Sequence, residues 1–342
     1  MADFTGPRIF ITAPRTIEFR DHTIRQSDLK ANVIVVKTRY TQISPGTEGA
    51  IYTGENKRVH DPGAWCAYPF NSGYANIGEV VWKGADVAGI ELGSFVFTQN
   101  QHGSYYTADP SAEAVIPLPD GLVQPPALVT RLAGTAMSAP LLSSRTLGVT
   151  VVVFGLGIVG NLAAQLYTLG GATVVGVDPN EARRGIATDV GIAAASGPEP
   201  DSIRAALESV GLPEKVDVVV DAVGLTDLDI ESVERVRRHG EFILLGSPKK
   251  ESTKGSLSFF RYAHLNNVRV IGALESGFPV HAPVGSHSLA RAFELAVRLI
   301  ADGRLKAEPL ISHVLPFEEA QTGYDGLIDR QSEYISVALD WA

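Results

Sequence analysis

Three glycines in the middle of the chain have the spacing of a phosphate-binding loop. Gly155, Gly157 and Gly160 follow directly on the apolar run 149–154 and open a segment with helical spacing. In that context the first glycine permits a tight turn, the second lets the backbone approach a pyrophosphate, and the third lets the helix pack close to the strand. The start of the helix would offer free N–H groups and the positive end of its dipole to the phosphates. The pattern predicts a dinucleotide site with the cofactor-binding residues Gly155, Gly157, Ile158, Val159 and Gly160.

A carboxylate after the next apolar run indicates which dinucleotide binds. Asp178 lies eighteen residues beyond Gly160. A carboxylate there can accept hydrogen bonds from both ribose hydroxyls of NAD and would repel the 2′-phosphate of NADP. NAD is therefore the predicted cofactor. Arg183, which we count as cofactor-binding, and Arg184 follow closely, so NADP stays open as a second cofactor. The alternative role for Asp178 is to cap the next helix.

Strands and helices alternate around this loop. Continuous apolar runs are typical of parallel strands that are buried on both faces. The predicted strands are 149–154, 172–177, 216–221, 241–245 and 268–272, and the predicted helices are 127–142, 158–169, 183–190, 202–210 and 229–238. This order predicts an α/β domain built on a doubly wound parallel sheet. Ligands bind at the carboxyl ends of such strands. This adds Val223, Gly246, Ser247, Ala273 and Leu274 to the predicted cofactor-binding residues.

The first 120 residues have a different texture. Short β-branched or aromatic runs at 9–11, 32–37, 78–82 and 94–97 are separated by Gly, Pro, Asn and Asp, which indicates a small β-barrel. An amphipathic helix is predicted at 286–302. The tail segment 333–339 is predicted to be a strand that returns to this first domain.

Composition excludes several classes of function. A chain of 342 residues is long enough for two domains. It contains no apolar stretch of membrane-spanning length and no signal peptide, so we expect no membrane partner and a cytoplasmic location. A net charge of −9 without a basic stripe argues against nucleic acid as a partner. Cys66 is the single cysteine, which excludes an intrachain disulfide and a Cys-x-x-Cys metal site.

The order of barrel, turn at 117–121, Ala-rich helix and glycine loop resembles the medium-chain dehydrogenase/reductase superfamily over nearly the whole chain. The segments 76–81 and 303–320 carry the same resemblance. It implies a GroES-like β-barrel catalytic domain at 1–125 and 276–342, a Rossmann dinucleotide-binding domain at 126–275, a small-molecule substrate and a homodimer formed through the edge of the cofactor sheet. The segment 44–48, together with Gly73 and Tyr74, is most similar to the bacteriochlorophyllide a dehydrogenase-like branch, which oxidises a hydroxyethyl group to acetyl.

Zinc-dependent members of that superfamily hold their metal with three side chains, and this chain departs from all three. The resemblance aligns Pro45 with a cysteine ligand, Tyr74 with a histidine ligand and Arg131 with the third ligand. The structural-zinc lobe is replaced by the short segment 99–103. A catalytic zinc needs three protein ligands of N, S or O type. No bound metal is therefore predicted.

Without zinc, a hydrogen-bond donor must stabilise the substrate oxygen while the nicotinamide carries the hydride. The resemblance aligns Thr47 with the hydroxyl that relays the substrate proton, and Tyr74 points where a ligand histidine would point. It aligns Glu48 with a carboxylate that would orient Tyr74 or act as a base. These three are the predicted catalytic residues; the alternatives are satisfied barrel hydroxyls and a structural ion pair.

Two further residues are predicted to contact substrate. Arg131 would bind a substrate carboxylate or phosphate, and its alternative role is a local cap or ion pair. His102 would face the cleft from the shortened lobe, and its alternative place is a surface loop.

The favoured function is zinc-independent interconversion of a secondary alcohol and a ketone with NAD(H). A second hypothesis is an enoyl or quinone reductase using NAD(P)H, because that activity needs little beyond a positioned hydride and backbone donors. A third is a non-catalytic NAD(H)-binding sensor.

Overall fold

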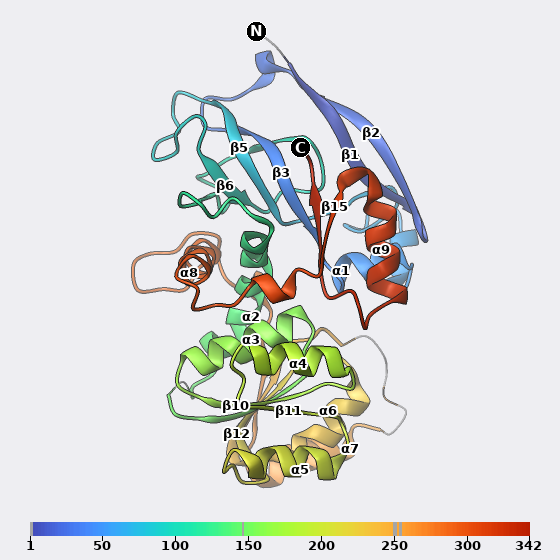
Figure 1. The fold of residues 1–342 in the computed structure, drawn as a ribbon, viewed down its shortest axis with the longest axis vertical. Coiled ribbons are helices and arrows are strands. Elements are labelled where there is room, and N and C mark those ends of the chain that lie inside the picture. The colour runs from blue at the N-terminus through green and yellow to red at the C-terminus, as the bar shows by residue number, and fades with distance from the viewer. Residues whose placement is uncertain (1–2, 146, 249–251, 253–254) are drawn as a thin grey trace. The chain divides into compact units, whose positions relative to one another are not determined.

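The computed structural model describes residues 3–145, 147–248, 252 and 255–342, and the chain divides into two units (Figure 1). Unit 1 comprises Met1–Arg131, Phe278–Gly303 and Ala307–Ala342. Unit 2 comprises Leu132–Gly277 and Arg304–Lys306. Unit 1 is thus built from both ends of the chain.

Unit 2 contains a six-stranded sheet in the order β11-β10-β9-β12-β13-β14, and every neighbouring pair is parallel. Its strands are β9 (Thr150–Phe154), β10 (Thr173–Val177), β11 (Ala194–Ser196), β12 (Val216–Asp221), β13 (Val236–Leu244) and β14 (Arg269–Gly272). Chain order 3-2-1-4-5-6 across the sheet is the order of a Rossmann fold. The predicted doubly wound parallel sheet is confirmed. The valines of β9 and β12 are buried, as continuous apolar strands require.

The helices of this sheet are α3 (Ile158–Leu169), α4 (Glu181–Asp189), α5 (Pro200–Ser209), α6 (Thr226–Ser232) and α7 (Leu257–Asn266), preceded by α2 (Thr130–Leu142), whose first two residues belong to unit 1. The predicted helix 229–238 was wrong at its end, because residues 236–238 already belong to β13. There Val236 pairs with Val216 and is completely buried. The helix α7 was not predicted; its apolar residues do not gather on one face, since Phe259 and Tyr262 pack against the core while Leu257, Phe260 and Leu265 are exposed.

Unit 1 contains two sheets. Its strands are β1 (Phe4–Ala13), β2 (Thr16–Ile24), β3 (Ile34–Ile43), β4 (Phe70–Asn71), β5 (Asn76–Lys83), β6 (Phe95–Thr98), β7 (Tyr105–Ala108), β8 (Ile116–Pro117), β15 (His313–Pro316) and β16 (Val337–Asp340). One sheet has the order β2-β1-β4, and the other has the order β15-β16-β3-β5-β6-β8 with β7 also paired to β3.

The strand β3 organises the larger sheet. One edge pairs with β5; the other pairs with β7 along its first half and with β16 along its second half. The tail of the chain therefore returns to the first domain as predicted, although the strand begins at Val337 and not at residue 333.

Three helices complete unit 1: α1 (Thr47–Tyr52), α8 (Leu289–Ala301) and α9 (Ala320–Asp329). Helices α1 and α9 share a core cluster in which the rings of Tyr52 and Tyr324 stack 4.8 Å apart. This packing fixes the position of α1, whose first turn carries Thr47 and Glu48, two of the three predicted catalytic residues. No helix among the described residues is long and apolar enough to cross a membrane.

Candidate active site and cofactor loop

The glycine loop between β9 and α3 has the conformation that its sequence requires. Gly155 has a φ of +87°, and an added Cβ there would lie 2.6 Å from Val223 Cγ2. A Cβ on Gly160 would collide with the Gly155 carbonyl oxygen, so this position needs glycine for close packing. Gly157 differs, because a Cβ there would meet only Arg183 Nη1 at 4.0 Å. The space beside Gly157 is open on the protein side, which fits a phosphate group approaching the backbone.

The first turn of α3 presents its N–H groups beside this open position. Gly157 is the N-cap, and among the described residues no side chain caps the helix. Ile158 is 3% exposed, so its side chain anchors the turn in the core, and Val159 is the next residue of the helix. The leading N–H groups of a helix have no intrahelical partner, so they can bind an anion.

Asp178 lies at the carboxyl end of β10 and is bonded to the backbone around it. Its Oδ2 accepts from the Leu156 N–H at 2.7 Å, and its Oδ1 accepts from the Asn180 N–H at 2.8 Å. It is not the cap of α4, because Asn180 holds that position and accepts from two backbone N–H groups. Asp178 thus ties the glycine loop to the end of the neighbouring strand.

The two arginines after Asp178 have different environments. Arg184 donates from Nη1 to the carbonyl oxygens of Asp178 and Pro179, at 2.8 and 2.9 Å. Arg183 Nη1 lies 3.8 Å from Asp178 Oδ2. Because Arg183 also lies next to the open position at Gly157, it is the arginine that can reach a phosphate of the cofactor.

The other predicted cofactor residues follow the ends of β12, β13 and β14. Asp221 shapes the first loop, since its carboxylate accepts from the N–H groups of Val223 at 2.8 Å and Gly224 at 3.0 Å. Gly246 packs so closely on Gly224 that a Cβ would lie 2.6 Å from the Gly224 nitrogen, and Ser247 follows it. Of the two predicted residues after β14, Ala273 is buried at 3% exposure and Leu274 is exposed at 66%.

In unit 1 the structure brings the predicted catalytic residues together. The Tyr74 hydroxyl donates to Ser44 Oγ. The same Tyr74 hydroxyl also forms a hydrogen bond with the Thr47 side chain. Thr47 is exposed, whereas Tyr74 is half-buried and directs its hydroxyl at the buried Ser44. Burial, and then the nearby Glu48 carboxylate, raise the pKa of the Tyr74 phenol. The phenol therefore stays protonated near neutral pH and acts as a donor.

Glu48 lies behind these hydroxyls with no exposed surface. Its Oε1 accepts from the Ser44 N–H at 2.9 Å. Its Oε2 accepts from the Tyr324 hydroxyl at 2.5 Å and lies 3.0 Å from His102 Nε2. A completely buried carboxylate must be satisfied by donors, and Glu48 has three. It orients Tyr74 through Ser44, and it cannot itself touch a substrate.

His102 is also completely buried, so the alternative of a surface loop was wrong. Its Nδ1 lies 2.7 Å from Thr41 Oγ1, which accepts a hydrogen bond from Trp341 Nε1 at 2.9 Å. The Glu48 carboxylate can only accept, so Nε2 carries the ring proton and donates to it. In the neutral ring Nδ1 then accepts from the Thr41 hydroxyl. We therefore correct the predicted substrate contact of His102 to a positioning role.

The neighbours of this cluster come from distant parts of the chain. Gly73 has a φ of +97° and lies very close to His102. A Cβ on Gly73 would lie 2.5 Å from the backbone nitrogen of His102. Arg131 places its guanidinium 4.9 Å from the centroid of the Tyr74 ring, a cation–π contact. Sequence reasoning missed Ser44, Thr41, Tyr324 and Trp341. Only Ser44 carried a local signal, because it begins the segment 44–48, but no role was assigned to it.

The donor set at the aligned zinc positions does not fit a zinc ion. Pro45 has no side-chain donor atom, the Tyr74 phenol is protonated and engaged with Ser44, and Arg131 is a cation. Zinc needs three anionic or neutral N, S or O ligands. Among the described residues, no group of three or more His, Cys, Asp or Glu side chains is arranged to hold a metal.

Comparison with known proteins shows which families and relatives the chain is similar to. Residues 159–295 match the model of the family described as zinc-binding dehydrogenase. The chain is 25% identical over 356 positions to D-guloside 3-dehydrogenase of Shigella flexneri, which covers 95% of this chain and 97% of that relative. The chain is therefore similar to zinc-binding dehydrogenases over residues 159–295 and to a sugar-derivative dehydrogenase over nearly its whole length.

Solved structures share the fold. An Escherichia coli short chain alcohol dehydrogenase complexed with the cofactor NADH has a TM-score of 0.78 at 16% identity, over 98% of this chain and 99% of that chain. A zinc-binding dehydrogenase from Sinorhizobium meliloti 1021, bound to NADP, has a TM-score of 0.77 at 19% identity, over 99% of this chain and 100% of that chain. The expected fold class, a Rossmann sheet with a GroES-like domain, is confirmed.

Proposed function

We propose that this protein is an NAD(H)-dependent oxidoreductase that interconverts a secondary alcohol and a ketone on a small molecule without catalytic zinc. The observation that carries the proposal is the pair of neighbouring hydroxyls, Thr47 and Tyr74, backed by the buried carboxylate Glu48. The likeness to D-guloside 3-dehydrogenase supports alcohol oxidation. A hydroxyethyl-bearing alcohol is the substrate class that the resemblance to the bacteriochlorophyllide branch adds.

In this proposal the substrate oxygen lies at the hydroxyl pair. Tyr74 is protonated, and its single hydroxyl proton turns from Ser44 Oγ to the substrate oxygen as negative charge develops there. Thr47, which is exposed, relays the hydroxyl proton to water during oxidation. Arg131, beside the Tyr74 ring, binds an anionic group of the substrate where one is present. Glu48 and His102 hold this arrangement rigid from behind.

The cofactor is held by the glycine loop and the first turn of α3, and when bound it supplies the hydride acceptor or donor. The open position at Gly157 and the free N–H groups of α3 fit its pyrophosphate. Asp178 favours NAD by repelling a 2′-phosphate, while Arg183 is the residue through which NADP would bind. The NADH and NADP complexes of the two similar structures support a nicotinamide cofactor of either kind.

Two assays distinguish this proposal from its alternatives. Hydroxyethyl-bearing alcohols, cyclitols, glycosides and simple secondary alcohols are tested with NAD, beside enones and quinones with NADH. Turnover of a secondary alcohol supports the proposal; turnover of enones or quinones alone would establish the reductase instead, and NADH binding without any turnover would indicate the sensor. Elemental analysis after mild dialysis is expected to find far less than one zinc per chain; about one zinc per chain would contradict the zinc-free part.

A further inference from the structure

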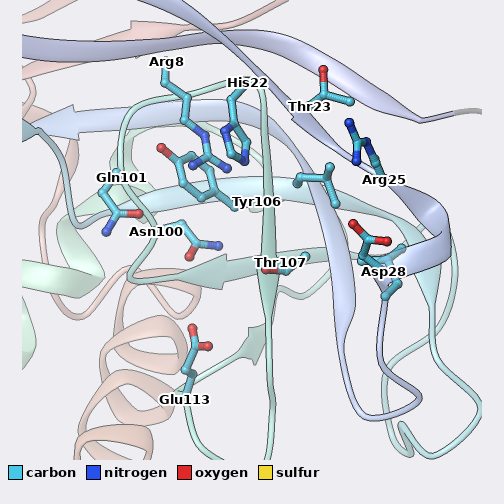
Figure 2. Close-up of a pocket in the computed structure, with 12 residues that line it drawn as sticks. Arg8, His22, Thr23, Arg25, Asp28, Asn100, Gln101, Tyr106, Thr107 and Glu113 are labelled. Atoms are coloured by element: carbon cyan, nitrogen blue, oxygen red, sulfur yellow. The ribbon is translucent and has the colours of Figure 1, made fainter.

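We propose that a cavity on unit 1, separate from the Thr47–Tyr74 pair, binds a small oxyanion, either a carboxylate or a phosphate. Its volume is about 550 Å³, within the range of small-molecule sites. Figure 2 shows the cavity. It is lined by Arg8 of β1, by the end of β2 and the residues that follow it, and by residues around β7. None of the residues proposed for catalysis or cofactor binding lines it.

Two guanidinium groups in this cavity lack a carboxylate partner among the described residues. Arg8 lies 4.0 Å over the ring of Tyr106 and donates from Nη2 to the Tyr105 carbonyl oxygen at 3.2 Å, but its buried Nε has no partner. Arg25, on the same wall, is exposed and forms no ion pair within the described part of the chain. An arginine fork without a carboxylate is a ready site for an anion, because it offers paired donors in a fixed plane.

A buried amide adds a third donor. Asn100 is 7% exposed, and its Nδ2 has no hydrogen-bond partner among the described residues. Leaving a buried donor unsatisfied costs about 1–3 kcal/mol. Acceptor oxygens of a bound anion would satisfy both this amide and Arg8 Nε after a small side-chain adjustment. Figure 2 shows Asn100 below the Arg8–Tyr106 pair in the cavity.

Two carboxyl groups and a histidine also line the cavity. Asp28 accepts a hydrogen bond from Ser27 at 2.8 Å and forms no ion pair within the described residues. Burial raises the pKa of Glu113. Burial, and then the charge of Arg8, lower the pKa of His22. Because the two carboxyl groups offset part of the arginine charge, selection of an anion rests mainly on the buried donors without a partner among the described residues, Arg8 Nε and Asn100 Nδ2.

The same cavity touches the loop that holds His102. Asn100 and Gln101 line it and directly precede His102, while Arg8 forms a β-bridge to Gly103. The Ile9 N–H also donates to the His102 carbonyl oxygen at 3.0 Å. An anion bound here would therefore brace residues 99–104 against local opening.

The test is calorimetric titration of the full chain with inorganic phosphate and, separately, with succinate, against chloride at equal ionic strength. We expect at least one of the two to bind, and the one that binds identifies the source of the oxyanion. Arg25→Gln and Asn100→Leu should each weaken binding about tenfold or more. Arg20→Gln removes an exposed arginine of β2 that pairs with Glu18 outside the cavity, so it should leave binding unchanged.

Hydrogen exchange supplies a second measurement. Saturating anion should slow exchange of the amides at 99–104 in the native chain and not in the Arg25→Gln variant. The proposal is overturned if neither anion binds beyond chloride, or if Arg20→Gln weakens binding as much as Arg25→Gln, which would indicate unspecific charge attraction. Binding that is insensitive to both cavity variants also overturns it.

Discussion

Tyr74 connects the exposed Thr47 to a buried hydrogen-bond network. Its hydroxyl donates to Ser44, and the N–H of the same serine is held by Glu48. Because burial and Glu48 both raise the pKa of the phenol, Tyr74 is suited to donate a hydrogen bond and unsuited to serve as a phenolate base at neutral pH. The chemistry at this position is therefore stabilisation of a developing alkoxide.

We expect Tyr74→Phe, and separately Thr47→Val, to lower kcat for the secondary alcohol by roughly a hundredfold, because each removes a donor or relay at the reacting oxygen. Cofactor affinity should stay unchanged. Steady-state kinetics and NADH fluorescence titration measure the two quantities. Tyr105→Phe, a change of the same size on β7, is the matched control. A native rate in both variants would remove the hydroxyl pair from the mechanism.

At the scale of elements, the turn from β9 into α3 separates glycines required by the fold from the one that leaves room for a ligand. Gly155 and Gly160 would collide with neighbouring protein atoms if they carried a Cβ, whereas Gly157 would not. The backbone at Gly157 has a φ of −60°, which any residue adopts. Substitution there tests the ligand site without disturbing the fold.

We expect Gly157→Val to weaken NADH and NADPH binding about tenfold or more by crowding the pyrophosphate, with an unchanged melting temperature. Gly185→Ala, at a position of α4 with open space around it, is the control. In the native chain the same fluorescence titration should show tighter binding of NADH than of NADPH. An unchanged affinity in Gly157→Val would place the pyrophosphate elsewhere, and tighter NADPH binding would mean that Arg183 outweighs Asp178.

Asp221 at the end of β12 and Asp229 in α6 form a buried pair of carboxyl groups, and this pair makes stability depend on pH. Burial, and then Asp221, raise the pKa of Asp229 from 3.8 to about 7. Between about pH 4 and pH 7 the folded state keeps a proton that the unfolded state has lost, so the free energy of unfolding falls as the pH rises through this window.

Asp229→Asn should therefore raise the melting temperature by a few degrees at pH 8 and change it little at pH 4, because an amide replaces the protonated acid. Thermal unfolding followed by circular dichroism at both pH values measures the effect. Asp189→Asn, at an exposed position of α4, should show no such difference between the two pH values. A lower melting temperature at pH 8 would mean that the ionised carboxylate stabilises the fold.

At the scale of the whole molecule, the described residues leave one edge of the cofactor sheet without a neighbouring strand. The strand β14 is the last of this sheet in the described part of the chain, and such an edge is a template for another strand. Large apolar side chains are exposed on and beside β14 and α7: Leu257, Phe260, Leu265, Val270 and Leu274. Such a surface on a charged protein marks an interaction site. We propose that it joins two copies of the chain.

We expect a homodimer in solution, and Val270→Lys should convert it to a monomer by placing a charge in that interface. Light scattering coupled to size-exclusion chromatography measures the mass. Leu92→Lys changes an exposed leucine of unit 1 and should leave the dimer intact. A native monomer, or a dimer that survives Val270→Lys, would contradict this interface.

The sequence by itself determined the Rossmann sheet and the glycine loop. These depend on local signals, since a buried parallel strand, a helix start and a phosphate loop each need particular residues within a few positions. The candidate hydroxyls Thr47 and Tyr74 came instead from the resemblance to the superfamily. The return of the tail to the first domain was also predicted, because its apolar character was visible locally, and the structure pairs it with β3. The helix α7 escaped prediction, since its apolar residues do not gather on one face.

Only the tertiary structure decided what surrounds Glu48. Its partners His102 and Tyr324 lie 54 and 276 residues away, and the chain of contacts ends at Trp341. No spacing rule links positions so far apart, because they meet only after the sheet and the α1–α9 core have formed. Folding likewise decided that His102 is buried and that Asn180, and not Asp178, caps α4. A side chain's role at these positions depends on which neighbours supply its donors and acceptors, and long-range packing supplies them.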